Sequence, residues 1–107
     1  MSDTIAPVLP DIQLDFVVMD EAELEKPFRV IIHNDNITPY DFVLVILCTI
    51  FELNINRAEE ITFEAHLNGL ALVIILPYKE AHEKVYNAQA SARQYGYPLS
   101  FTLEADD

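Results

Sequence analysis

The residues best suited to chemistry lie in the segment 33–40, whose sequence is H-N-D-N-I-T-P-Y. The segment holds an imidazole, two amides and a carboxylate, and it separates a strand-like apolar run from a longer apolar run. If His66 at the end of a later helix packs back on Asn34 and Asp35, the three side chains form a receptor for an ammonium group. Charge-assisted hydrogen bonds of this kind contribute about 1.5–3 kcal/mol each when sheltered. The alternative, an Asx turn and a helix-capping histidine, is favoured by composition alone.

Other site chemistry finds little support in the sequence. There is no G-x-S-x-G elbow, glycine-rich phosphate loop or H-E-x-x-H pair. Carboxylates are plentiful, but none lies in an apolar context that would suit acid–base catalysis. His33, His66 and His82 are scattered along the chain, and the single cysteine, Cys48, excludes an internal disulfide and a cysteine-rich zinc site. We therefore predict a protein that is not an enzyme and has no metal or cofactor.

Length, composition and charge limit the number of domains, the kinds of partner and the location that can be expected. A chain of 107 residues with 51% hydrophobic residues is most simply one domain with a real core. A net charge of −12 with only six Lys and Arg argues against nucleic acid and fits neutral or positively charged partners, although acidity could serve solubility alone. The acidic start does not resemble a secretory signal, and no apolar stretch approaches the ~20 residues of a membrane span. A cytoplasmic location is therefore expected, with no membrane partner.

The chain divides into an extension and a core. Residues 1–26 contain two prolines and an acidic run, and are predicted to be a mobile acidic N-terminal extension, followed by a core domain over residues 27–107. Within the extension, residues 12–18 (I-Q-L-D-F-V-V) alternate at first between apolar and polar, which indicates an extra strand or a segment that orders on a partner.

The first half of the core predicts one strand and one helix. Residues 28–33 should form a strand. Thr38 is a suitable N-cap and Pro39 suits the first helical position, so a helix is expected from there to about Glu52. This helix is apolar nearly all round, which predicts an exposed patch at Leu44, Val45 and Cys48 and possible weak self-association.

The second half adds two helices and two strands. Asn54 is the expected N-cap and Gly69 the expected C-cap of a second helix. Residues 70–76 read as a strand that is apolar on both faces, hence central or covered, and a third helix follows over about residues 78–95. Residues 99–103 alternate as a last strand. The order β-α-α-β-α-β predicts an α+β fold, a three-stranded antiparallel sheet packed against three helices.

The motifs R-V-I-I-H-N-D-x-x-T-P-x-x-F-V, A-H-x-N-G and A-R-x-x-G-x-P-L, followed by T-L-E, make residues 28–104 similar to the ClpS family. The resemblance implies this same fold and an adaptor of the bacterial and plastid N-degron pathway. Such adaptors bind a protein's hydrophobic N-terminal residue and deliver the protein to the N-terminal domain of a ClpA- or ClpC-type AAA+ unfoldase.

The resemblance also implies roles for individual residues. The substrate's α-amino group and first backbone atoms would be bound by Asn34, Asp35, Asn36, Thr38 and His66. The pocket for the first side chain would be formed by Tyr40, Val43, Thr62, Ala65 and Leu99. Lys84 and Lys79 would lie at the contact with the unfoldase.

Several of these positions depart from the family pattern. Asn36 replaces a usual second aspartate, which removes a negative charge from an ammonium site. Tyr40 and Thr62 stand where methionines are usual, and Ala65 where a valine is usual, so one wall of the pocket grows while two shrink. Lys79 stands where an acidic residue is common.

The sequence thus predicts an N-degron adaptor with altered side-chain preference, in the cytoplasm or a plastid stroma. One alternative is a ClpS-like module that binds or regulates the unfoldase without recognising N-terminal residues. A ribosomal stalk-type domain would explain the acidity but not Asn34, the Thr38-Pro39 pair or His66.

Overall fold

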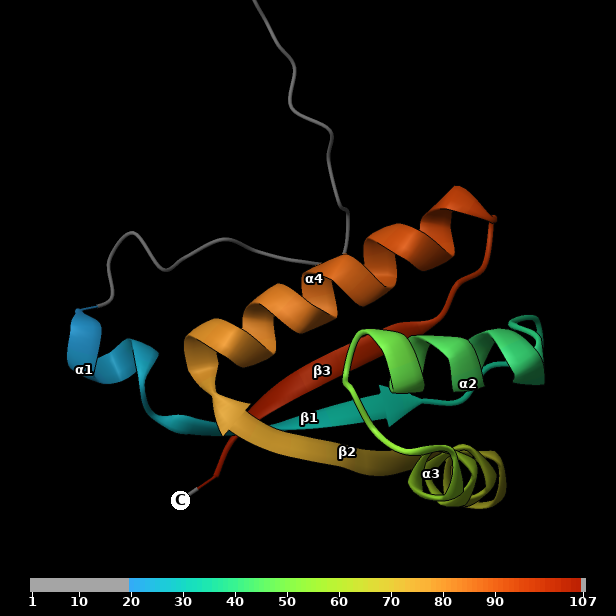
Figure 1. The fold of residues 1–107 in the computed structure, drawn as a ribbon, viewed down its shortest axis with the longest axis horizontal. Helices are drawn as coiled ribbons and strands as arrows, with labels where there is room; N and C mark the ends of the chain where they lie inside the picture. Colours follow the sequence, from blue (N-terminus) through green and yellow to red (C-terminus); the bar gives the residue numbers. More distant parts are fainter. Residues whose placement is uncertain (1–19, 107) are drawn as a thin grey trace, which may run out of the picture.

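The structure is a computed structural model that describes residues 20–106. A three-stranded antiparallel sheet in the order β2-β1-β3 carries its helices mainly on one face (Figure 1). This confirms the predicted α+β class, and only the short helix α1 was not foreseen. In chain order the elements are α1 (Glu21–Leu24), β1 (Pro27–His33), α2 (Tyr40–Thr49), α3 (Ile55–Asn68), β2 (Leu70–Pro77), α4 (Tyr78–Gln94) and β3 (Ser100–Ala105).

The core lies between the sheet and the helices. Leu47 of α2 and Ile61 of α3 are completely buried, and Val30 of the central strand lies in the same cluster. Helix α4 contributes small side chains, and its Ala81 and Ala88 are fully buried. Small residues at helical spacing let α4 lie close along the sheet, as the sequence pattern predicted.

Strand β2 corrects one prediction. Its run of apolar residues indicated a central or covered strand, but β2 is an edge strand and β1 pairs on both sides. Burial alternates along β2: Ala71 and Val73 are buried, whereas Leu70, Leu72 and Ile75 are exposed. An apolar run shows that a segment suits a strand, but it does not say how many neighbours that strand has.

The start and end of α2 also differ from the prediction. Pro39, not Thr38, occupies the N-cap, and no side chain caps it. The Thr38 hydroxyl instead donates to the Asp35 carboxylate. The helix ends at Thr49 instead of about Glu52, whose φ of 60° lies in the left-handed region. A non-glycine residue in that region cannot continue a right-handed helix.

The other helix boundaries match the sequence prediction closely. The Asn54 side chain accepts a hydrogen bond from the Arg57 N–H and caps α3. Gly69, with a φ of 90°, ends that helix and donates its N–H to the Ala65 carbonyl. Helix α4 ends one residue before the predicted Tyr95, ahead of Gly96 at a φ of 78°.

The predicted apolar patch on α2 is mostly covered. Leu44 and Cys48 are half-buried and pack against the core, and Val45 is 54% exposed. The predicted alternating segment, residues 12–18, lies outside the described residues. Of the predicted extension, residues 20–26 are described, and the Lys26 carbonyl accepts a hydrogen bond from the Tyr78 N–H. Among residues 20–106, no helix has the length and apolar character to cross a membrane.

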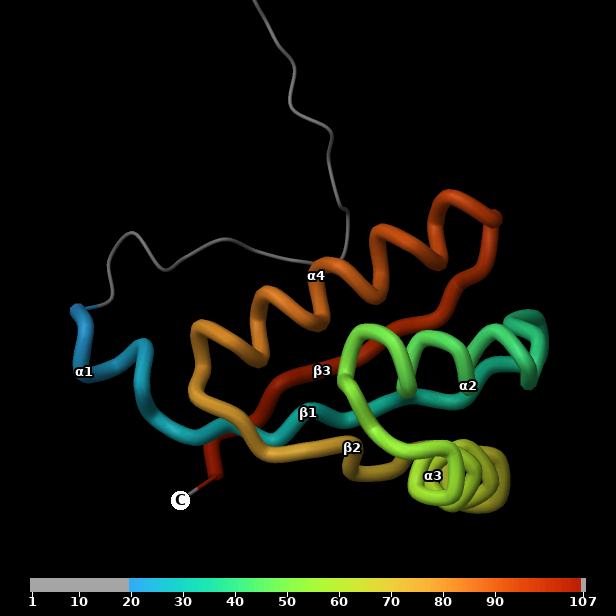
Figure 2. Tube along the Cα trace, in the orientation of Figure 1, coloured from blue at the N-terminus to red at the C-terminus, as the bar shows by residue number. Residues whose placement is uncertain are grey.

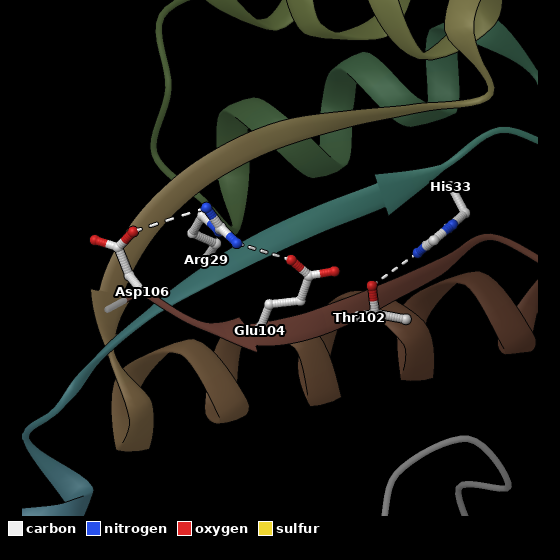
Figure 3. Close-up of polar contacts among 5 residues, drawn as sticks. All are labelled: Arg29, His33, Thr102, Glu104 and Asp106. Carbon is white, nitrogen blue, oxygen red and sulfur yellow. Dashed lines mark hydrogen bonds and ion pairs between the residues drawn. The ribbon is translucent and has the colours of Figure 1, made fainter.

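The face of the sheet away from α2 and α4 carries a polar row along β1 and β3 (Figure 3). Arg29 pairs with Glu104 at 3.0 Å and more distantly with Asp106, and the His33 ring hydrogen-bonds the Thr102 hydroxyl at 2.8 Å. The Arg29 and Glu104 side chains are about half exposed, so this ion pair contributes little to stability. The bond to Thr102 matters more for position, because it fixes the His33 ring at the end of β1.

Candidate functional site

A pocket opens where β1 ends, between the loop that follows it and helix α3. Figure 2 shows the chain turning after β1 into α2, with α3 seen end-on beside α2. The cavity has a volume of about 270 Å³. It is lined by Ile32, His33, Asn34, Asp35, Thr38, Tyr40, Val43, Thr62, Phe63, Ala65, His66 and Leu99.

The structure brings together most of the predicted site residues. All predicted side-chain pocket residues line the cavity, and so do Asn34, Asp35, Thr38 and His66. Asn36 does not line it; the residue is exposed in the turn between Asp35 and Thr38. The departure that the resemblance implies at Asn36 therefore does not alter the lining of the pocket.

Sequence reasoning missed Ile32, His33 and Phe63 as lining residues. Phe63 lies three residues before His66 on α3, and residues at that spacing are neighbours on a helix surface. A helical projection centred on His66 could therefore have found it. Ile32 and His33 are the last residues of β1, directly before the predicted Asn34, so adjacency alone was the available signal.

The loop after β1 is shaped by Asp35. Its carboxylate accepts hydrogen bonds from the Ile37 N–H at 2.8 Å, from the Thr38 N–H at 2.6 Å and from the Thr38 hydroxyl at 2.8 Å. Burial raises the pKa of Asp35, but these hydrogen bonds and the positive charge of Arg93 lower it by more. The net pKa lies below its ordinary value, so Asp35 is a carboxylate at neutral pH. The predicted Asx-type turn is thus present, and Asp35 is the residue that makes it.

Asn34 and His66 are positioned by the backbone around them. The Asn34 N–H donates to the Gly69 carbonyl at 2.9 Å, which ties the end of β1 to the turn after α3. His66 lies in the last turn of α3, just before that same glycine. Within residues 20–106, neither the Asn34 amide group nor the His66 ring makes a hydrogen bond. Both side chains line the pocket with unused hydrogen-bonding capacity.

The far wall of the pocket is apolar and buried. Ile32, Ala65 and Leu99 are each no more than 3% exposed, and Val43 is buried as well. Thr62, also buried, donates its hydroxyl to the Ala58 carbonyl at 2.8 Å. Two aromatic side chains at the pocket, Tyr40 and Phe63, are exposed by 50% and 59%. The cavity therefore suits a ligand with a polar head at Asn34 and His66 and an apolar body against the far wall.

The two lysines predicted to meet a partner lie away from this pocket, on α4. The Lys84 ammonium group donates to the Ile50 carbonyl at 3.0 Å and pairs with Glu52 at 3.2 Å, and its side chain is only 17% exposed. It therefore stabilises the end of α2. Lys79 is exposed in the first turn of α4, in a shallow surface depression that it shares with Glu25, Glu80 and Glu83.

No metal site is evident in the described part of the chain: over residues 20–106, no three His, Cys, Asp or Glu side chains are grouped to hold an ion.

Comparisons with known proteins agree with the fold. The family model of the ATP-dependent Clp protease adaptor protein ClpS matches residues 23–102. The ClpS adapter of Clostridium acetobutylicum is 35% identical over 88 residues, which are 80% of this chain and 87% of that protein. The ClpS adapter of Nautilia profundicola is 38% identical over 90 residues, covering 82% and 93% of the two chains.

The fold is also similar to that of a solved ClpS structure. Agrobacterium tumefaciens ClpS2 bound to L-phenylalaninamide is similar with a TM-score of 0.73 and 30% identity. The similarity covers 77% of this chain and 99% of that protein.

Proposed function

Because the chain belongs to the ClpS family of ATP-dependent Clp protease adaptors, we propose that it binds the N-terminal residue of substrate proteins and delivers them to a ClpA- or ClpC-type AAA+ unfoldase. In this role the protein is an adaptor and not itself a protease. Cytoplasmic location, or a plastid stroma, is part of the same proposal.

The pocket is the observation that carries the recognition half of the proposal. Asn34 and His66 offer unused acceptors at its polar end, and Val43, Ala65 and Leu99 form an apolar wall. An N-terminal hydrophobic residue has the matching parts: a free ammonium group and a side chain that gains from leaving water. Phenylalaninamide, the ligand of Agrobacterium tumefaciens ClpS2, has the same two parts, an amino group beside a phenyl side chain.

Side-chain preference should differ from that of most family members. Thr62 and Ala65 are small and lie on the buried wall, whereas Tyr40 adds a ring at the exposed edge of the cavity. A pocket with more room inside and a bulkier edge favours long, flat side chains that can pass the edge and fill the interior. We therefore expect aromatic first residues to bind better than branched aliphatic ones.

Titration of labelled peptides tests recognition directly. Peptides identical except for a first residue of Phe, Tyr, Leu, Trp, Ile, Val or Met are titrated by fluorescence anisotropy, each beside its N-acetylated form. Acetylation removes the ammonium charge, so the free-amine peptides with aromatic first residues should bind at least tenfold more tightly. Equal binding of free and acetylated peptides would remove amino-terminus recognition from the proposal.

The delivery half of the proposal rests on Lys79 and Lys84. Lys79 is exposed and available to a partner, whereas Lys84 is largely occupied at the end of α2. Lys79→Ala should weaken binding to an isolated unfoldase N-terminal domain and leave the thermal midpoint unchanged. Lys84→Met should weaken that binding with a lower thermal midpoint, because it also removes the hydrogen bond to the Ile50 carbonyl. If neither variant changes unfoldase binding, the contact lies elsewhere.

A second candidate function follows from the loop. Asn36 carries no charge, and the Asp35 carboxylate already accepts three hydrogen bonds, so negative charge free to face an ammonium group is scarce. This favours a module that binds or regulates the unfoldase without reading N-terminal residues. Binding of the unfoldase domain together with no preference for free over acetylated peptides would identify it.

Weak self-association through Leu44, Val45 and Cys48 stays a prediction. Val45 is the exposed member of this set, and the other two pack on the core, so any such contact would be small. Light scattering over a range of protein concentrations tests it, and a constant monomer mass would exclude it.

A further inference from the structure

Thr62 differs in chemistry from the rest of the wall to which it belongs. The residues around it on the buried side of the pocket, Val43, Ala65 and Leu99, are apolar. Thr62 is just as buried, with 7% of its surface exposed, yet it carries an oxygen atom. A hydroxyl on such a wall can distinguish side chains that differ only by one polar atom.

The hydrogen bond that Thr62 already makes fixes what it can do. Its hydroxyl donates to the Ala58 carbonyl at 2.8 Å, so its only hydrogen is in use. A hydroxyl oxygen has acceptor capacity besides its one donor. Towards the pocket Thr62 can therefore only accept a hydrogen bond. An apolar ligand leaves no new unpaired group at this oxygen, because the oxygen is already hydrogen-bonded.

The distance along α3 suits an aromatic side chain. Thr62 lies one helical turn before His66, and four residues of α-helix rise about 6 Å. Both residues line the same cavity. Consider a substrate whose N-terminal amino group lies at His66 and whose first side chain runs along α3. If that first residue is about as long as one helical turn, the tip of its side chain lies beside Thr62. Tyrosine has that length and carries an O–H donor at its tip.

We propose that Thr62 accepts a hydrogen bond from the phenol of an N-terminal tyrosine, so that the pocket selects tyrosine over apolar residues of the same shape. The inference rests on the proposed function and identifies its substrate class. Without an acceptor, a buried phenol loses its hydrogen bond to water and binds less well than an apolar group of equal size. One neutral hydrogen bond should give tyrosine an advantage of about three- to tenfold.

Three peptides that differ only in the first residue test this: tyrosine, phenylalanine and 4-methylphenylalanine, whose methyl group occupies the place of the phenol hydroxyl. The wild-type protein should bind the tyrosine peptide three- to tenfold more tightly than the 4-methylphenylalanine peptide. Thr62→Val keeps the shape and removes the oxygen, so the ratio of the two affinities should fall to one or reverse. Thr62→Ser keeps the hydroxyl and should retain the preference for tyrosine.

Thr49→Val is a matched control, since the Thr49 hydroxyl likewise donates to the carbonyl four residues earlier, that of Val45 at 2.6 Å, but Thr49 is exposed and does not line the pocket. The tyrosine preference should survive it. A preference that survives Thr62→Val, or that Thr49→Val removes, would overturn the proposal. Because each result is a ratio of two affinities, a general loss of binding caused by altered packing cancels.

The phenylalanine peptide separates this inference from the proposed function. If it binds better than its acetylated form but tyrosine has no advantage in the wild-type protein, the Thr62 proposal fails and amino-terminus recognition stands. If free and acetylated forms of all three peptides bind equally, recognition itself fails, and the Thr62 proposal fails with it.

Discussion

The two polar sides of the pocket use their hydrogen-bonding groups in opposite ways. In the loop after β1, the Asp35 carboxylate accepts three hydrogen bonds and the Thr38 hydroxyl donates one of them. On α3, the His66 ring makes no hydrogen bond within residues 20–106 and faces the cavity. Asp35 therefore gives the loop its shape, whereas His66 keeps its capacity for a ligand.

This difference separates the residues that stabilise the loop from the residue that is available to bind a ligand. Asp35, Thr38 and His66 all carry hydrogen-bonding groups, but Asp35 and Thr38 use theirs within the fold. Removing the Asp35 carboxylate should change stability and binding together. Removing His66 should change binding alone.

The largest effect is expected from His66→Ala. The variant loses a hydrogen bond to a charged amino group, which corresponds to about a 10- to 150-fold loss of affinity for free-amine peptides. Its unfolding midpoint should stay near that of the wild type, because the ring has no partner in the described fold. Leu67→Ala is the control, since Leu67 is 64% exposed on the same helix and does not line the pocket. A clear fall in the stability of His66→Ala would contradict the division of roles.

Asp35→Ala should affect both properties. It leaves two backbone N–H groups and one hydroxyl without their acceptor, which should cost about 1–2 kcal/mol in the free energy of unfolding. The unfolding midpoint should fall by roughly 5–15 °C for a domain of this size. Peptide affinity should fall as well, because the loop positions Asn34. Asn36→Ala serves as the control, and little change is expected from this exposed residue outside the pocket lining.

A smaller effect on stability is expected at Gly69, whose carbonyl joins the turn after α3 to the loop after β1. Gly69→Ala places a side chain at a φ of 90°, which costs about 1 kcal/mol although nothing lies within 4 Å of the new Cβ atom. Because the Gly69 carbonyl accepts the Asn34 N–H, peptide affinity should fall too. Gly96→Ala is a matched control with a similar φ of 78° and equally open space, but it lies beyond α4 and outside the pocket lining. It should lower stability only, and an equal loss of affinity in both variants would show that the Gly69–Asn34 bond does not matter.

Much of the fold could be predicted from the sequence because local signals agreed with one another. Asn54 and Gly69 cap the two ends of α3, as their capping preferences predicted, and small residues at helical spacing identified α4. The edge position of β2 could not be predicted, because its apolar side chains suit a strand with one neighbour or two. Helix α1 is one turn long and begins at Asp20, whose side chain accepts the Glu23 N–H, and one turn is too short for a periodic pattern.

The candidate site, like the fold, could be predicted only in part. The resemblance to the ClpS family implied that Asn34 and His66 share one site, and both line the same cavity, but the hydrogen bonds made by neighbouring residues could not be predicted in this way. Thr38 was a suitable N-cap by type, yet its N–H and its hydroxyl both donate to Asp35, three residues earlier, and Pro39 occupies the N-cap. These hydrogen bonds depend on the geometry of the turn, which residue preferences alone do not contain.

The smallest effect is the dependence of stability on pH through Asp35. Its pKa in the folded protein lies below the ordinary value of 3.8, so the unfolded chain binds more protons in the acidic range. The stability that the carboxylate contributes is therefore fully present above about pH 4–5 and is lost as the pH falls through the folded pKa. Urea unfolding of the wild type and of Asp35→Asn between pH 2.5 and 6 measures it. The wild type should be the more stable at pH 6, and the difference should shrink as the pH falls. A difference that grows on acidification would mean that burial outweighs the hydrogen bonds in setting the pKa of Asp35. The hydrogen bonds of the loop would then not be what holds Asp35 as a carboxylate.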